Sequence, residues 1–399
     1  WTIISFIVLV HVFKIRYLNY YDELINEEKI DTKDDKKKEE KSKIKENKKV
    51  IIVLVVLVVG ILLFVFLNNN KLDPKVKIKY TEASKITLEE YKNDVFSMKK
   101  PKDWIVESAG TGMYYAIRVY DPTETANQVF LMLKIQPLLK STAAKSFWQE
   151  YSRLSGNSPQ YQVFANAVVL EQPTTECFYT SFNNIADYLT SVEPTLSNMK
   201  FPTFSNFKKV EEFASVASMK NYALDSKVLR GTFTSEKGKE GEGLFLASIV
   251  NFGNQYQNGV DFLYYMAYDI MSITAANNEF INYKDILLES INSIEFSDSY
   301  VKQTIDDGNA QTKQALALNA SVQKSFDSYM SAWENRNKSY DIMSQKQSDA
   351  TLGYERVYDT ETNEVYKAYN GFTDDYTGER YKAISDEMYT EKVYGYIEK

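Results

Sequence analysis

The stretch VIIVLVVLVVGILLFVFL, Val50–Leu67, contains eighteen consecutive residues without a charged side chain. A helix of this length can cross the hydrocarbon core of a bilayer, and it is too uniformly apolar to have one polar and one apolar face. Inside a bilayer a helix satisfies all of its own backbone polar groups. We therefore predict a transmembrane helix at 50–67 that contacts the lipid bilayer; a buried core helix is the alternative.

The residues before this stretch orient it in the membrane. Residues 17–49 carry mixed charge, and ten lysines lie between positions 29 and 49. Because cytoplasmic segments next to a membrane helix are rich in lysine, we place 17–49 in the cytoplasm and 68–399 outside it. Residues 1–16 begin with thirteen mostly apolar residues, which we interpret as the end of a truncated second membrane helix; an interfacial or a signal-like segment is the alternative. We expect a single-pass or two-pass protein of the cell membrane.

Composition excludes several partners and mechanisms. Residues 68–399 hold 35 Lys and Arg against 44 Asp and Glu, which argues against a nucleic-acid partner because such binding needs a cationic surface. Cys177 is the one cysteine, so no intrachain disulfide can form, and this favours a bacterial surface over a eukaryotic secreted scaffold. The one histidine is His11, so residues 12–399 cannot supply a Ser/His/Asp triad, a Cys/His pair or a histidine-ligated zinc site.

The residues after the apolar stretch predict a stalk and then a folded domain. Residues 68–93 begin with polar NNNKLDPK and are expected to act as a spacer. In the domain at 94–300, YYAIRVYDP and NQVFLMLKIQP alternate as an antiparallel hairpin does, and Ser141 is an N-cap candidate for a helix through STAAKSFWQEYSRL. An insertion at about 158–205 is expected to hold a strand, YQVFANAVVLEQ, and a helix, ECFYTSFNNIADYLTSV. Strands sheltered by helices rather than alternating with them indicate an α+β fold.

Short motifs at both ends of this domain resemble a known family. The domain opens with F-S-x-x-x-P-x-x-W from Phe96 to Trp104, has a hairpin that ends in I-Q-P at Ile135–Pro137, and closes with L-L-E-S-I-N-S-I-E-F at Leu287–Phe296. These motifs look like bacterial PsbP-type domains, and the similarity covers roughly residues 94–300. The resemblance implies an antiparallel sheet flanked by helices, with a binding or accessory role rather than a reaction. The insertion departs from the compact pattern of that family.

Two further segments complete the chain. Residues 306–350 predict a long helical connector with a single apolar stripe, because its apolar residues recur three or four positions apart. These residues are Leu318, Val322, Phe326, Met330 and Trp333. The connector is expected to pack on a neighbouring domain, or to bind a partner helix. Residues 351–399 contain nine tyrosines and predict a small tyrosine-rich β-meander.

The tyrosine-rich tail is the candidate recognition surface. Tyr354, Arg356 and Tyr358 alternate onto one face of a predicted strand, and Tyr366 and Ala368 are expected to lie across from them. Exposed tyrosines bind sugar rings and partner surfaces, because the ring offers a wide apolar area with a hydroxyl group. The alternative is that these tyrosines form the cross-strand pairs that hold a small sheet together.

No catalytic, cofactor or metal site is predicted from the remaining motifs. Acid-rich turns at 359–364 and 374–379 hold oxygen ligands but lack the spacing of a calcium-binding EF-hand. The glycine-rich run Lys237–Gly243 precedes a strand-like segment instead of the helix that a phosphate loop requires. Paired carboxylates could support glycoside hydrolysis, but the sequence does not show which two would face each other.

These features predict a membrane-anchored, non-catalytic binding or accessory module of a bacterial envelope, without a cofactor. Its expected partner is cell-wall polymer or another membrane protein. The alternatives are a carboxylate-dependent hydrolase of cell-wall glycans and a structural subunit of a membrane complex.

Overall fold

The computed structural model describes residue 60 and residues 73–215, 217–252, 256–257, 260–261, 264–306, 326, 329 and 338–399. The chain divides into two compact units, 1–72 and 73–399. The predicted segments 1–16 and 17–49 lie outside the described residues, as does the predicted membrane helix at 50–67 apart from Gly60. Among the residues that the structure describes, no helix is both long and apolar enough to cross a membrane.

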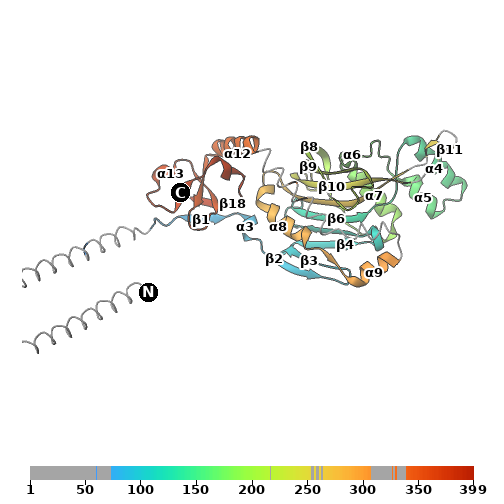
Figure 1. The fold of residues 1–399 in the computed structure, drawn as a ribbon, viewed down its shortest axis with the longest axis horizontal. Helices are drawn as coiled ribbons and strands as arrows, with labels where there is room; N and C mark the ends of the chain where they lie inside the picture. The colour runs from blue at the N-terminus through green and yellow to red at the C-terminus, as the bar shows by residue number, and fades with distance from the viewer. Residues whose placement is uncertain are drawn as a thin grey trace, which may run out of the picture. The chain divides into compact units, whose positions relative to one another are not determined.

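The second unit is built around an antiparallel sheet of eight strands (Figure 1). Seven strands stand in the order β4, β5, β6, β13, β10, β9 and β8, and the short strand β7 pairs with β13. Their bounds are β4 Ile105–Ala109, β5 Ala116–Tyr120, β6 Gln128–Lys134, β7 Leu138–Leu139, β8 Ser205–Ala214, β9 Ala223–Thr234, β10 Glu240–Phe252 and β13 Tyr264–Ala276. The central strands are buried along nearly their whole length, as expected for a sheet that is covered on both faces.

Helices cover one face of this large sheet, and a helix with a second sheet covers the other. On the first face α6 (Thr175–Thr180) and α7 (Phe182–Val192) pack on an aromatic core. On the second face lie α8 (Phe280–Asn292) and a three-stranded sheet in the order β14, β3, β2. Those strands are β2 Leu88–Lys92, β3 Phe96–Pro101 and β14 Glu295–Phe296. The unit is therefore a mixed α+β structure with antiparallel sheets and covering helices.

Most local predictions for 94–300 are confirmed. β5 and β6 form the expected antiparallel hairpin, and the Ser141 side chain caps α4 (Thr142–Leu154) by accepting a hydrogen bond from the Ala144 N–H at 3.1 Å. The predicted strand YQVFANAVVLEQ is wrong, because it contains α5 (Pro159–Asn166). A proline in the first turn favours a helix start, and Phe164 of α5 stacks on Trp148 of α4 with ring centroids 4.6 Å apart.

A separate small sheet is built from both ends of the second unit. Its order is β1, β18, β16, β15, β17, with bounds β1 Lys77–Tyr80, β15 Tyr354–Asp359, β16 Val365–Tyr369, β17 Tyr381–Ala383 and β18 Val393–Glu398. The four tail strands occur where they were predicted. They do not form a meander, however, because β16 and β18 are parallel neighbours, whereas a meander joins antiparallel strands in sequence order.

The predicted stalk is also partly wrong. β1 pairs antiparallel with β18, so Lys77 lies opposite Glu398, and β2 pairs with β3. Between them the short helix α3 (Glu82–Lys85) begins at Thr81. Residues 77–92 therefore belong to the fold, because their partners lie in strands that sequence order does not reveal.

The remaining elements include the described parts of the predicted connector 306–350. They are α9 Asp298–Asp306, α12 Lys338–Leu352, α13 Phe372–Asp375, β11 Tyr256–Gln257, β12 Val260–Asp261, and the short 3₁₀ turns η1 Gly112–Tyr114, η2 Pro194–Leu196 and η3 Asp386–Thr390. Phe326 and Tyr329 are both buried in the core of the second unit, and the Tyr329 ring lies 4.6 Å from that of Phe213. The other four members of the predicted apolar stripe lie outside the described residues.

Candidate binding cleft

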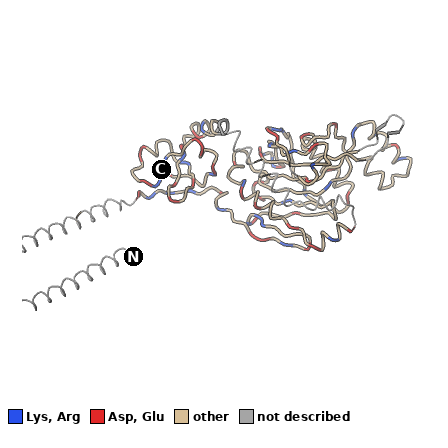
Figure 2. The backbone as a smooth tube through the Cα atoms, in the orientation of Figure 1, with Lys and Arg blue, Asp and Glu red and all other residues tan. Residues whose placement is uncertain are grey.

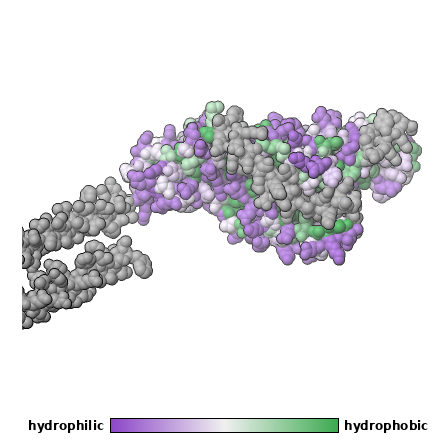
Figure 3. Space-filling view, viewed as in Figure 1, coloured by the Kyte–Doolittle hydropathy of each residue, from purple (hydrophilic) through white to green (hydrophobic). Residues whose placement is uncertain are grey.

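A cleft with a volume of about 1080 Å³ lies where the small sheet, α3, α8 and the turn between β5 and β6 come together. On the face drawn in Figure 3, hydrophilic residues cover most of the part that holds the small sheet. The cleft is lined by residues 79–83, 86, 102–104, 121–124, 127, 276, 279, 283, 354, 369 and 396–399. Because its walls come from segments far apart in the sequence, the cleft forms only when the whole unit has folded.

One wall carries tyrosines of the small sheet. Tyr354 and Tyr369 lie opposite each other on β15 and β16, and the Tyr396 ring of β18 lies 5.5 Å from the Tyr354 ring. All three are half-buried, whereas Tyr80 of β1 is 48% exposed. The Lys399 Nζ lies 5.3 Å from the Tyr369 ring centroid, within the range of a cation–π contact. These rings give the wall a broad, partly accessible apolar surface.

The opposite wall contains Trp104 and Tyr283, and both side chains are about 5% exposed. Their ring centroids are 6.4 Å apart. Burial raises the pKa of Tyr283 to about 12, and the negative charges of Asp121, Glu279 and Glu82 contribute to this shift. The carboxylates of Asp121, Glu279 and Glu82 therefore all disfavour ionisation of the Tyr283 hydroxyl group.

Hydrogen bonds join the small sheet to α8 and α3 beside the cleft. The Asn282 side chain donates from Nδ2 to Glu279 Oε2 at 2.8 Å, and its Oδ1 accepts from the backbone N–H of Val393 at 3.1 Å. The backbone N–H of Thr81 donates to the Tyr394 carbonyl at 2.9 Å. Because Asn282 is buried, its two bonds set the position of the Glu279 carboxylate relative to β18.

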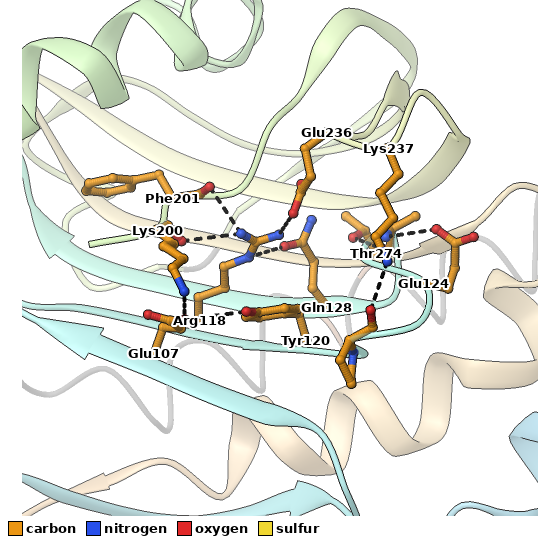
Figure 4. A network of polar contacts seen from close by, with 12 residues as sticks. Glu107, Arg118, Tyr120, Glu124, Gln128, Lys200, Phe201, Glu236, Lys237 and Thr274 are labelled. Atoms are coloured by element: carbon orange, nitrogen blue, oxygen red, sulfur yellow. Dashed lines mark hydrogen bonds and ion pairs between the residues drawn. The ribbon is translucent and has the colours of Figure 1, made fainter. Parts of the chain in front are cut away.

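The turn between β5 and β6 is held by the polar network of Figure 4. Lys237 Nζ donates to the carbonyls of Pro122 and Thr123 at 2.8 and 3.0 Å. The backbone N–H of Asp121 donates to the Asn127 carbonyl at 3.0 Å, and Asn127 Oδ1 accepts from the N–H of Ala276 at 2.9 Å. These contacts fix the side of the cleft that carries Asp121.

Arg118 lies beside this turn and is 3% exposed. Its guanidinium donates to Gln128 Oε1 at 2.7 Å, to Glu236 Oε1 at 2.7 Å, and to the carbonyls of Lys200 and Phe201 at 3.3 and 3.2 Å. It also lies 4.4 Å from the Tyr120 ring centroid. These partners come from β6, from the hairpin between β9 and β10, and from the segment before β8, so Arg118 joins three parts of the fold and does not line the cleft.

The predicted recognition residues lie in different places. Tyr354 lines the cleft, while Tyr358 lies four residues further along the same face of β15, half-buried and outside the cleft lining. Arg356 is buried on that face and donates to Asp349 Oδ2 at 2.6 Å and to the Tyr389 carbonyl at 2.9 Å. The Arg356 guanidinium thus attaches α12 to the small sheet.

Tyr366 lies on the other face of the small sheet. It is paired with Val357 instead of lying across from Tyr354, and it is buried in a cluster that includes Phe372 and Tyr381. Its hydroxyl donates to Glu364. Burial leaves Tyr366 and Arg356 little exposed area for recognition, and Tyr358 lies outside the cleft lining. Of the four predicted residues, Tyr354 is therefore the one that the cleft retains.

Sequence reasoning did not find Trp104, Tyr283, Tyr369, Tyr396 or Asp121 as site residues. Trp104 was noted in the opening motif, but nothing in the sequence shows that β1 and β18 bring the tail next to it. The acid-rich turn at 359–364 forms contacts within the small sheet, because Asp359 makes an ion pair with Arg380 at 2.6 Å. In the part of the chain that the structure describes, no group of three or more His, Cys, Asp or Glu side chains is arranged to hold a metal ion.

A buried carboxylate lies elsewhere, in the middle of β13. Asp269 has a left-handed backbone angle, φ 51°, next to a register shift between β10 and β13. It accepts hydrogen bonds from Ser218 Oγ at 2.9 Å, from the N–H of Met219 at 3.1 Å and from Ser248 Oγ at 3.2 Å. Burial raises the pKa of Asp269. Because the side chain is fully buried, we assign it to the core.

The chain matches no protein-family model, and no curated protein is significantly similar to it. Function is therefore argued from the cleft itself.

Proposed function

We propose that residues 73–399 form a non-catalytic binding module of a bacterial envelope, attached through the predicted membrane helix at 50–67, and that the cleft binds a saccharide chain of wall polymer. The observation that carries this proposal is the combination of four accessible or half-buried tyrosines with carboxylates and an amide in one cleft. The tyrosines are Tyr80, Tyr354, Tyr369 and Tyr396, and the buried rings of Trp104 and Tyr283 also line the cleft. A PsbP-like domain at 94–300 belongs to the same proposal, supported by the antiparallel sheet and its covering helices.

Saccharide recognition suits this set of residues for a physical reason. A sugar ring has apolar C–H faces and a rim of hydroxyl groups. Tyrosine and tryptophan rings cover the apolar faces with little loss of side-chain entropy, and carboxylate or amide groups bond to the hydroxyls. The volume of about 1080 Å³ is at the upper end for small-molecule pockets, which suits several sugar units better than one.

The test is co-sedimentation of the full chain, purified in detergent, with insoluble cell-wall sacculi. Tyr354→Ala is expected to weaken binding about five- to thirtyfold, corresponding to about 1 to 2 kcal/mol for loss of a central aromatic contact. The matched control is Tyr358→Ala, on the same strand and face but outside the cleft lining, which should bind like the unaltered chain. Absence of pelleting by the unaltered chain, or equal losses in the two variants with circular dichroism unchanged, refutes the proposal.

A second candidate function is hydrolysis of wall glycans, favoured by the carboxylates of Asp121, Glu279 and Glu82 in the cleft lining. A hydrolase of this kind needs a carboxylic acid and a carboxylate on either side of the scissile bond. Release of soluble fragments from sacculi by the unaltered chain, lost in Glu279→Gln or Asp121→Asn while pelleting persists, would replace the binding proposal with this one.

A further inference from the structure

We infer that the cleft selects saccharide chains that carry free ammonium groups over neutral ones; this inference rests on the proposed saccharide function and names its ligand class. The first observation is the charge of the lining. It contains the carboxylates Glu82, Asp103, Asp121, Glu124, Glu279 and Glu398 against the ammonium groups of Lys79, Lys102 and Lys399. Figure 2 shows both signs of charge along the whole unit, which has its own excess of acidic residues. Glu82 and Glu398 already pair with Lys85 and Lys77, so a bound cation depends on the other carboxylates of the lining.

The second observation concerns the partners of these carboxylates. Asp121 accepts hydrogen bonds from the N–H and hydroxyl of Thr123 at 2.8 and 2.6 Å, and Glu279 accepts from the amide of Asn282. All of these donors are neutral, and within the described ranges neither Asp121 nor Glu279 forms an ion pair. Both are half-buried, where a carboxylate without a counter-charge favours a bound cation more than it would in open water.

The third observation is that the tyrosine rings of this wall already hold ammonium groups of the protein. Lys399 Nζ lies 5.3 Å from the Tyr369 ring centroid and Lys367 Nζ lies 5.9 Å from that of Tyr354. A ring face attracts a cation through its quadrupole, so these contacts show that the setting of the two rings suits a positive charge. A ligand ammonium would have to displace the lysine or use another ring of this wall. Burial is the main cause of the raised pKa of Tyr283, and the nearby carboxylates add to it because they disfavour a further negative charge.

The fourth observation is an unused donor. Trp104 lines the cleft at 5% exposure, and its indole N–H donates to no acceptor among the described residues. Because Trp104 lines the cleft, this N–H is available to a ligand oxygen that accepts a hydrogen bond. An amine-bearing sugar supplies all three features that the cleft matches: an apolar ring face, hydroxyl or ring oxygens, and a positive charge.

The test compares two ligands with the same sugar backbone, one with ammonium groups and one with neutral acetamido groups. The full chain is titrated calorimetrically at pH 6 with a glucosamine tetramer and with its N-acetylated counterpart. The charged tetramer is expected to bind roughly tenfold tighter at low salt, and the preference should shrink as salt is added because ion-pair contributions are screened. Glu279→Gln should reduce the ratio of the two affinities several-fold, because it removes a carboxylate that only the charged tetramer can pair with.

The matched control is Glu289→Gln in α8, the helix that begins directly after Glu279. It removes the same charge outside the cleft lining, from an exposed pair with Lys99, and should keep the preference. If both tetramers bind equally, or the acetylated one binds tighter, this inference is overturned while the saccharide function stands. If neither tetramer binds and sacculi are not pelleted, the proposed function itself fails. If Glu279→Gln and Glu289→Gln reduce the preference equally, the preference follows from the net charge of the protein and not from the cleft. That result would also overturn the inference.

Discussion

Replacement of Arg118 by methionine tests whether the polar network beside the cleft is a structural requirement. Methionine keeps much of the side-chain volume but removes all four hydrogen bonds of the guanidinium. Two backbone carbonyls and Gln128 Oε1 then lose their donor, and Glu236 loses its counter-charge. Removing one partner of a buried pair costs about 3 to 5 kcal/mol. Because the Glu236 side chain is 32% exposed and can regain water, we expect the lower end, about 3 kcal/mol.

The assay is urea unfolding of the full chain followed by tryptophan fluorescence, with Arg153→Met as the matched control. Arg153 also pairs with a glutamate, through Glu150 at 2.6 Å, but on the exposed surface of α4. Exposed pairs contribute little, so this control should unfold like the unaltered chain. An Arg118→Met variant that is as stable as the control would show that the buried network does not stabilise the fold.

Three further substitutions test other parts of the structure. Because burial raises the pKa of Asp269, its stabilising contribution is complete below about pH 3.9, the unfolded value, and is lost as pH rises through the folded pKa. In urea titrations at successive pH values, Asp269→Asn should therefore gain stability relative to the unaltered chain as pH rises, and a constant difference contradicts the burial argument. A Cβ at Gly395 would lie 2.6 Å from the Lys79 carbonyl. Gly395→Ala should therefore separate β1 from β18 and expose residues 73–80 to limited proteolysis. Resistance to cleavage contradicts the pairing. Phe245→Ala should lower the free energy of unfolding by about 3 to 5 kcal/mol in the same urea assay, because the Phe245 ring is fully buried against Phe204 and Phe207. A loss below about 1 kcal/mol contradicts the described core.

Local patterns in the sequence predicted most of the elements of the second unit. Ser141 marked the start of α4, and the alternation in the segments of β5 and β6 predicted their hairpin, because both depend on residues close together in the chain. The segment of α5 was mistaken for a strand, since YQVFANAVV contains β-branched and aromatic residues that favour strands. Its contact with Trp148 of α4, which favours the helix, is not visible in local composition.

The cleft could not be predicted in the same way, because it depends on pairings between distant residues. Tyr354 was identified from its alternation with Arg356 and Tyr358, and it does line the cleft. The same alternation could not show that Arg356 would be buried against α12. Trp104 and Tyr283 come next to Tyr354 because β1 joins β18 and because Asn282 and Thr81 bond to residues of the tail, and a polar segment such as 68–93 carries no local signal of these partners.

The pairing of β1 with β18 also decides which experiments can identify the binding surface. A chain shortened at about residue 348 would lose Tyr354, Tyr369 and Tyr396 together, and β1 would lose the one strand with which it pairs in the described sheet. Loss of binding after such a truncation would follow equally from a missing surface and from a disrupted fold. Tyr354→Ala and Tyr358→Ala remove the same side-chain type from one face of one strand, so a difference between them measures the cleft alone. The paired substitutions therefore test the proposed function more directly than removal of the tail.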